Sequence, residues 1–298
     1  MSTQDFLVEI GTEELPPKAL NLLSRSFATS VASGLKKQSL TCGQIKQFAT
    51  PRRLALIVPD LCEHQEDREI EKFGPAVKAA FDESGAPTPA ASGFARSCGV
   101  EVSALQTGLK DGVEKLVFRS SQKGSATSSL LPEIISSALE ALPIPKRMRW
   151  GSARTEFVRP VHWVILLFGE NLIEASLLGV SSNTFSFGHR FHHNEKIEIS
   201  SPSEYEEKLA NPGFVIADFD KRKQLINKLV LEQGTALKAT AVIDEKLLDE
   251  VTGLVEYPVA LTGNFDRNFL DVPQEALVSA MKTHQKYFYL VDKDNVLM

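Results

Sequence analysis

The sequence predicts an α+β fold in which mixed, largely antiparallel sheets pack against helices. Short apolar or alternating runs typical of strands recur along the 298 residues, and segments with apolar residues at helical spacing lie between them. The two kinds of segment do not alternate regularly, as they do in a doubly wound parallel fold. The composition, 43% hydrophobic and 24% charged, is that of a soluble globular protein with one large core or two ordinary ones.

The segment FLVEIGTEELPPKAL, residues 6–20, predicts a strand, a tight turn and a helix start. Apolar side chains alternate along the strand, and a Gly-Thr pair ends it. The two prolines suit the first turn of a helix, which we expect to run from Pro17 to Lys37. Glu13 and Glu14 lie close to this helix start, where negative charge is favourable, so helix capping is their simplest interpretation.

The remaining elements follow from the same patterns. Residues 53–58 are apolar on both faces, which predicts an internal strand covered on both sides. Residues 66–112 are polar and interrupted by glycines and prolines, which favours short helices in an extended insertion. The weakest joints along the chain lie near Gly124 and Ser200. Further strands are expected at 44–49, 114–119, 161–168, 172–178, 257–261 and 286–291, and further helices at 128–142, 218–238 and 273–283.

Several classes of protein are excluded by what the sequence lacks. It contains no phosphate-binding loop, dinucleotide fingerprint, nucleophile elbow, CxxC or HExxH motif, so no catalytic residue and no ATP site are predicted. The net charge of −5 argues against non-specific coating of nucleic acid but allows a local basic patch. No apolar run is long enough to span a membrane. Three widely spaced cysteines, an odd number, indicate free thiols in a reducing cytoplasm.

The densest basic stretch of the chain covers residues 146–159. Trp150 and Phe157 are interleaved with it, and Trp163 follows. Basic residues between aromatic ones are typical of surfaces that contact RNA backbones and unstacked bases. The alternative is ordinary packing at a strand edge, with both tryptophans in the core. The residues predicted here to contact RNA are Lys146, Arg147, Arg149, Arg154 and Arg159.

Two shorter basic pairs are further candidates for RNA contact. Arg52 and Arg53 directly precede the internal strand, and the planar guanidinium group can engage two phosphate oxygens at once. The alternative is that one of them pairs with a carboxylate of the N-terminal segment and the other is solvated. Near the end of the chain, Lys282 and Lys286 accompany a helix whose apolar stripe is expected to face the core.

The only histidine cluster, GHRFHH, begins at Gly188. His189 and Arg190 are candidates for RNA contact. A metal site is the less favoured alternative, because no cysteine lies nearby and no carboxylate has a suitable spacing. The simplest interpretation is a turn in which Phe191 fills the core. We therefore expect no metal ion.

The N-terminal segment closely resembles the start of the beta subunits of bacterial tetrameric glycyl-tRNA synthetases. Other segments fit this family in the same order, so the resemblance covers nearly the whole chain. They are FATPRRLALIV (48–58), DREIEKFGPAVKAAFD (67–82), LPIPKRMRWG (142–151), FVRPVHWVILLFG (157–169), GHRF (188–191) and FLDVPQEALVSAMKTHQKYF (269–288).

The resemblance implies a fold similar to the B3/B4 module of phenylalanyl-tRNA synthetase, over residues 1–298. It also implies a non-adenylating subunit of glycine–tRNA ligase, since the family places glycine activation on a separate alpha subunit. The expected partners are that alpha subunit, in an alpha2beta2 assembly, and tRNA for glycine. The complete enzyme uses ATP with Mg, and no cofactor is expected in this chain. The family's beta subunits are longer, so a truncated N-terminal fragment without the downstream domains is expected.

Two other functions remain open from the sequence. The chain could be a tRNA-editing deacylase domain, as the B3/B4 module is in its own family. A tight pocket for glycine already excludes larger amino acids, which makes editing less needed. The chain could also be a subunit-interaction module that holds the alpha subunit and touches no RNA.

Overall fold

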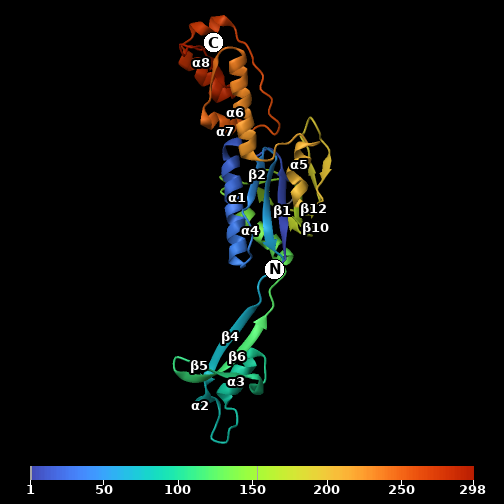
Figure 1. The fold of residues 1–298 in the computed structure, drawn as a ribbon, viewed down its shortest axis with the longest axis vertical. Coiled ribbons are helices and arrows are strands. Elements are labelled where there is room, and N and C mark those ends of the chain that lie inside the picture. Colours follow the sequence, from blue (N-terminus) through green and yellow to red (C-terminus); the bar gives the residue numbers. More distant parts are fainter. Residues whose placement is uncertain (1, 153) are drawn as a thin grey trace. The chain divides into compact units, whose positions relative to one another are not determined.

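The computed structural model describes residues 2–152 and 154–298. Contacts between residues divide the chain into two compact units, Met1–Glu63 with Thr127–Met298, and His64–Ala126. The second unit is an insertion between two segments of the first (Figure 1). It begins at His64, next to the start of the polar insertion expected over residues 66–112, and it ends close to Gly124, one of the two weak joints that the sequence indicates.

The first unit is organised around one large sheet, which has seven strands in the described part of the chain. Their order is β11-β12-β9-β1-β3-β2, with β10 paired to β9. All neighbours are antiparallel except β12 and β9, which are parallel. The strands are β1 (Thr3–Thr12), β2 (Lys46–Thr50), β3 (Arg53–Cys62), β9 (Val161–Phe168), β10 (Asn171–Leu172), β11 (Ser176–Leu177) and β12 (Val180–Asn183).

Apolar cores cover both faces of this sheet. Helices α1 (Pro17–Lys37) and α4 (Thr127–Glu140) pack on one face, where alternate side chains of β1, β3 and β9 meet them. The other face packs against α5 (Tyr205–Ala210) and β14 (Lys196–Glu198). Figure 1 shows α1 and α5 on opposite sides of the sheet. Successive side chains of a strand point to opposite faces, so strands covered on both sides are apolar on both faces over most of their length.

The first unit also contains shorter strands and a group of helices late in the chain. Two of these helices, α6 and α7, are directly preceded by the capping residues Asp218 and Asp244, whose carboxylates accept hydrogen bonds from backbone N–H groups of the first turn. The elements are β7 (Met148–Arg149), β8 (Glu156–Phe157), β13 (Phe185–Phe187), η2 (Pro202–Glu204), α6 (Phe219–Ala236), β15 (Thr240–Val242), α7 (Glu245–Thr252), η3 (Arg267–Asp271), α8 (Gln274–Ala280), the π-helical turn η4 (Met281–Gln285) and β16 (Tyr289–Val291).

The second unit is built on a small antiparallel sheet of order β4-β6-β5. Its core is small, centred on Ala80, Ala91 and Leu116. Most other side chains of its strands are at least partly exposed. Its elements are β4 (Arg68–Ala76), α2 (Val77–Ala80), α3 (Pro89–Cys98), η1 (Val102–Ala104), β5 (Gln106–Lys110) and β6 (Val113–Gln122).

The structure confirms the α+β class, the helix from Pro17 to Lys37 and the internal position of the strand that begins at Arg53. The prediction of short helices alone in residues 66–112 is wrong, because β4 and β5 lie there. The predicted strand at 257–261 is also wrong. That segment has no regular secondary structure, no described strand pairs with it, and Val259 and Leu261 are 68% and 88% exposed.

Within the described residues, none of the helices combines the length and the apolar character that crossing a membrane requires.

Gly11 is required where β1 passes beneath the indole ring of Trp163. An added Cβ at this position would lie 1.9 Å from Trp163 Cε2 and 2.0 Å from Cδ2, so the buried ring would have to move. Gly11→Ala should lower the free energy of unfolding by about 1–3 kcal/mol, the usual cost of overpacking a core. Denaturant unfolding followed by tryptophan fluorescence measures this. Gly93→Ala is the control, because nothing lies within 4 Å of its added Cβ; equal stability of the two variants would contradict the prediction.

Candidate nucleic-acid interface

Arg53 carries a completely buried charge at the start of β3. Its Nη2 lies 3.2 Å from Glu256 Oε1 and donates to the Phe187 carbonyl at 3.0 Å. Nη1 donates to Ser186 Oγ at 3.4 Å. Burial alone would lower the pKa of Arg53, but the charges of Glu256 and Glu9 outweigh burial and raise it. Arg53 therefore stays charged and has no surface on which RNA could be contacted, which corrects the prediction for this residue.

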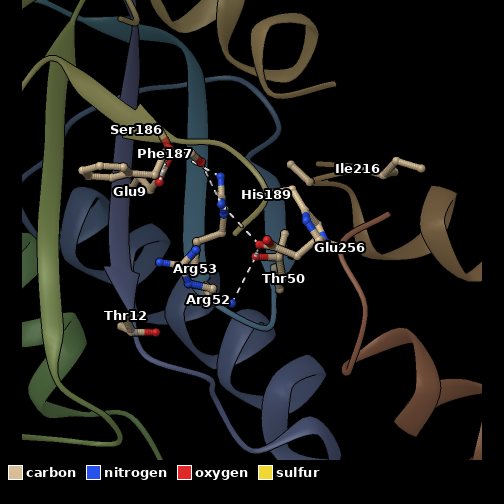
Figure 2. Close-up of polar contacts among 12 residues, drawn as sticks. Glu9, Thr12, Thr50, Arg52, Arg53, Ser186, Phe187, His189, Ile216 and Glu256 are labelled. Atoms are coloured by element: carbon tan, nitrogen blue, oxygen red, sulfur yellow. Dashed lines mark hydrogen bonds and ion pairs between the residues drawn. The ribbon is translucent and has the colours of Figure 1, made fainter. Parts of the chain in front are cut away.

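A second buried carboxylate, Glu9, extends these contacts across the sheet. Trp163 Nε1 and Ser186 Oγ each donate to Glu9 Oε1 at 2.6 Å. Thr50 Oγ1 donates to Glu256 Oε1 at 2.6 Å. Such charge-assisted hydrogen bonds compensate buried carboxylates for the hydration that they lose on folding. Figure 2 shows how the side chains converge. We call this set the buried ion network: Glu9, Thr50, Arg53, Ser186 and Glu256.

Arg222 on α6 is a second enclosed arginine, with 0% exposure. Its Nη2 donates to the carbonyls of Ala49 at 2.7 Å and Thr252 at 3.1 Å, and Nη1 donates to the carbonyl of Ile216. Burial lowers the pKa of Arg222 to about 10. Its contacts are mainly with carbonyl oxygens, so it fastens α6 to the end of β2 and to the end of α7.

Arg52 lies at the edge of the buried ion network and is half-buried. Its guanidinium carbon is 5.6 Å from the centroid of the Trp163 ring, a distance typical of a cation–π contact. Nε and Nη1 are enclosed and have no hydrogen-bond partner among the described residues. Burial lowers the pKa of Arg52, although Glu256 counteracts this. Nη2 is not among the enclosed atoms, so it is the donor of Arg52 that an anion could contact.

Glu13 and Glu14 precede α1 but do not cap it. The residue before the helix is Pro16, and the first turn contains no acidic residue. Instead, Arg190 Nη2 lies 2.8 Å from Glu13, and Nη1 lies 3.4 Å from Glu14. The hydrogen bond from Arg190 lowers the pKa of Glu13. The capping interpretation is therefore wrong, because both carboxylates form surface ion pairs with Arg190, which lies in the loop that follows β13.

Five aromatic side chains form an exposed ring cluster beside this ion pair. The rings of His189 and His192 are tilted by 35° with centroids 4.5 Å apart, and the other ring pairs have centroid distances of 5.3–6.1 Å. The predicted role of Phe191 in the core is wrong, since 85% of it is exposed. The cluster consists of His189, Phe191, His192, Phe214 and Tyr257.

The ring of His189 is fixed by the backbone. Its Nδ1 accepts hydrogen bonds from the N–H groups of Phe191 and His192 at 3.2 and 3.3 Å. Nδ1 therefore carries no proton, and burial lowers the pKa of His189. Within the described residues, no group of three or more His, Cys, Asp or Glu side chains is arranged to hold a metal ion.

The basic stretch at 146–159 is mostly exposed, and its side chains differ in how far they are already paired. Arg149 forms an ion pair with Glu156 at 2.5 Å. Arg159 donates to the Glu14 carbonyl, and Arg147 to the carbonyl of Glu140 at the end of α4, both at 2.8 Å. Lys146, Arg147 and Arg154 are exposed and form no ion pair with a described carboxylate. Trp163 is in the core that faces α5, and Trp150 is half-buried against the core on the other face of the sheet.

The two lysines near the end of the chain are engaged in ion pairs. Lys282 lies 2.5 Å from Asp244, and Lys286 lies 3.0 Å from Glu250. Both side chains are about one-third exposed or less. Because their charges are already compensated, they offer less to an RNA phosphate than the loop at 146–154 does.

Sequence reasoning missed Glu256, Arg222 and Phe214. Glu256 is the one charged residue in the apolar run LVEYPVAL, which is the single signal that could have indicated a buried carboxylate. Arg222 lies on a helix rich in charge, where nothing distinguishes it from solvated neighbours. The position of Phe214 in the ring cluster depends on a tertiary contact that no sequence period encodes.

Comparison with known proteins places the chain among subunits of aminoacyl-tRNA synthetases. Residues 6–298 match the family described as "Glycyl-tRNA synthetase beta subunit", and the chain belongs to this family. A "Glycine--tRNA ligase beta subunit" of Hahella chejuensis is 52% identical over 298 residues, and that of Marinobacter nauticus is 51% identical over 300 residues. One from Coxiella burnetii is 47% identical over 298 residues.

In each case the match covers 100% of this chain and 43% of the relative. The chain thus spans less than half the length of the curated relatives it matches. The match therefore establishes family membership for residues 6–298.

The buried ion network should be essential for stability. Glu256→Ala leaves the fully buried charge of Arg53 without its ion-pair partner, so the free energy of unfolding should fall by about 3–5 kcal/mol. Denaturant unfolding measures this. Glu232→Ala is the matched control, because the exposed Lys228–Glu232 pair at 3.8 Å should contribute less than about 1 kcal/mol. A Glu256→Ala variant as stable as the control would show that Arg53 finds other compensation.

The burial of neutral His189 should make stability depend on pH. The folded pKa is below the ordinary value of 6.5, so on acidification the unfolded chain takes up this proton first. Stability should therefore fall as the pH drops below about 6.5, until it passes the folded pKa. His189→Asn, which keeps an acceptor near Nδ1 but does not titrate, should flatten this part of the profile. Melting temperatures between neutral and mildly acidic pH test it, with the exposed His284→Asn as control; a slope unchanged by His189→Asn would contradict it.

Proposed function

We propose that this chain is part of the non-adenylating subunit of glycine–tRNA ligase, in which it positions tRNA. Its partners are an alpha subunit, in an alpha2beta2 assembly, and tRNA for glycine, and it acts in the cytoplasm. The family match over residues 6–298 is the observation that carries this proposal. The names of the relatives specify a beta subunit, which supports a second kind of subunit as partner.

The proposed division of chemistry between subunits rests on the family resemblance. The sequence of this chain contains no phosphate-binding loop that would cradle ATP. In our proposal, ATP with Mg is bound and glycine activated on the alpha subunit. This chain contributes by holding the RNA in place, which accelerates a reaction on another chain by reducing the entropy of the encounter.

The exposed basic loop supports the RNA contact. Lys146, Arg147 and Arg154 are exposed, and the half-buried Trp150 lies between them in sequence. Contacts from such side chains to phosphates fix the position of an RNA without reading its sequence. Of the remaining predicted RNA contacts, Arg52 is half-buried, and its Nε and Nη1 have no hydrogen-bond partner among the described residues. Arg149, Arg159, His189, Arg190, Lys282 and Lys286 all have partners within the chain.

The geometry gives the editing alternative no support. The hydroxyl of Ser186 lies 2.6 Å from the carboxylate of Glu9, which resembles a nucleophile beside a base. Both residues are 0% exposed, however, and Glu9 also accepts from Trp163. No substrate reaches this pair, so it has a structural role. The similarity to the B3/B4 module remains part of the proposal and rests on the sequence resemblance.

The double variant Lys146→Ala with Arg147→Ala should weaken tRNA binding. Each lost phosphate contact should also reduce the slope of log affinity against log salt concentration by about one unit. Filter binding or fluorescence anisotropy across a salt series gives both quantities. Lys36→Ala with Lys37→Ala, which removes two exposed charges at the end of α1, is the control. If both variants behave alike, or if the wild-type chain does not bind tRNA, this surface does not position RNA.

A further inference from the structure

We propose that the ring cluster and Arg52 together form a binding site for an unpaired nucleotide of RNA. The base stacks on the exposed rings, and its phosphate is bound by Arg52. This inference rests on the proposed function, since it takes RNA as the ligand. It goes further by assigning residues and by requiring a single strand.

The rings offer an unusual amount of exposed aromatic surface at one place. Phe191 is 85% exposed, and Phe214 and Tyr257 are 39% and 40% exposed. They come from three separate segments of the chain, yet His192 is within 6.1 Å of both Phe214 and Tyr257, measured between ring centroids. Contiguous apolar surface of this kind is costly in water and marks binding sites. Aromatic side chains are also the usual platforms for unstacked bases.

The backbone holds these rings at the surface. Phe214 has φ +53°, a left-handed conformation that bulky residues rarely adopt. The neighbouring Val215 N–H donates to the Leu209 carbonyl at 2.8 Å, and the Ile216 N–H donates to the carbonyl of Glu256 at 2.9 Å, which brings the segments of Phe214 and Tyr257 together. Strained conformations of this kind persist only where the surroundings enforce them, and they gather at ligand sites.

The loop that carries the histidines is fixed to the same turn. The His189 N–H donates to the Gly213 carbonyl at 2.7 Å. Gly188 leaves no room for a side chain, because an added Cβ would lie 2.3 Å from the His193 carbonyl oxygen. The site is therefore preorganised, and binding a ligand would require little ordering of the protein.

A positive charge lies next to the rings. The Arg52 N–H donates to Thr50 Oγ1 at 3.3 Å, and Thr50 Oγ1 donates to Glu256 Oε1 at 2.6 Å. Glu256 directly precedes Tyr257, so Arg52 lies close to the segment that carries one of the rings. Arg53 is enclosed and paired, and Arg190 is paired with Glu13 and Glu14. Arg52 alone among these three arginines has no ion pair and no side-chain hydrogen bond with the described residues. Its stacking on Trp163 holds it in place, so it is the group that a phosphate would bind.

The combination of stacking surface and cation selects the ligand. An apolar peptide would use the rings but leave Arg52 without a partner, and an inorganic anion would use Arg52 but not the rings. A base inside a duplex has both faces covered by its neighbours, so only an unpaired nucleotide presents a free face together with a phosphate.

The test uses the full 298-residue chain, a short single-stranded oligoribonucleotide that carries the fluorescent base 2-aminopurine, and a blunt duplex of the same length. Fluorescence reports stacking of the base, and anisotropy reports affinity. Phe214→Leu with Tyr257→Leu should weaken single-strand binding about tenfold and abolish the fluorescence quenching, with duplex binding unchanged. Arg52→Gln should weaken single-strand binding and reduce the salt slope by about one unit.

Matched controls separate the site from general effects. Phe269→Leu removes a ring that is 53% exposed, and Arg25→Gln removes an exposed charge on α1. Both should bind like the wild type. Melting temperatures of all variants show that they are folded, and Tyr257→Leu alone replaces the double variant if that one unfolds.

The possible failures are distinguishable. If the chain binds tRNA and single strands but the ring variants still quench 2-aminopurine, the rings are not the site, and the proposed function stands. Equal losses for duplex and single strand also overturn the stacking role. A third outcome is that an apolar peptide binds the wild type but not the ring variant and does not displace RNA. The ring cluster is then a peptide site, and the nucleotide site proposed here is wrong. If no RNA binds, the inference and the proposed function fail together.

Discussion

The buried charge of Arg53 is the constraint on which the rest of the first unit depends. A guanidinium without water is tolerated only where carboxylates and carbonyls replace its hydration, and here those groups come from distant parts of the chain. Glu256 must reach the sheet from beyond α7, and Ser186 must lie between Arg53 and Glu9. The end of the sheet and the segment after α7 are consequently held in one arrangement, and the ring cluster is built on that arrangement.

The sequence predicted the structure well where a local pattern of apolar residues or prolines decides it. Apolar positions on both faces of residues 53–58 identified an internal strand, and the proline pair at the start of α1 located that helix. The same reasoning failed in the second unit, because β4 and β5 face solvent and carry few apolar residues to mark them. It failed again at 257–261, where apolar residues typical of a strand are exposed and unpaired.

The candidate site was harder to predict than the fold, because its chemistry depends on partners far apart in the sequence. His189, Arg190 and Arg52 were singled out by residue type alone. Their different roles come from Glu13, Trp163 and the backbone, which no local pattern relates to them. Arg52 and Arg53 are adjacent in sequence, yet Arg53 is the first residue of β3 and is enclosed in the network, whereas Arg52 lies in the turn between β2 and β3, at the edge of the network.

The junction of the second unit has a consequence for how the chain can vary. Thr127 N–H donates to the Glu63 carbonyl at 2.8 Å, and Thr127 Oγ1 donates to the Cys62 carbonyl at 2.6 Å, so the chain leaves and re-enters the first unit at neighbouring points. A long and a short connection between these points differ little in the entropy lost when their ends are brought together, because this loss grows only with the logarithm of the loop length. The 63 residues of His64–Ala126 can thus be lengthened, shortened or exchanged for a tight turn in the course of evolution while β3 and α4 keep their places.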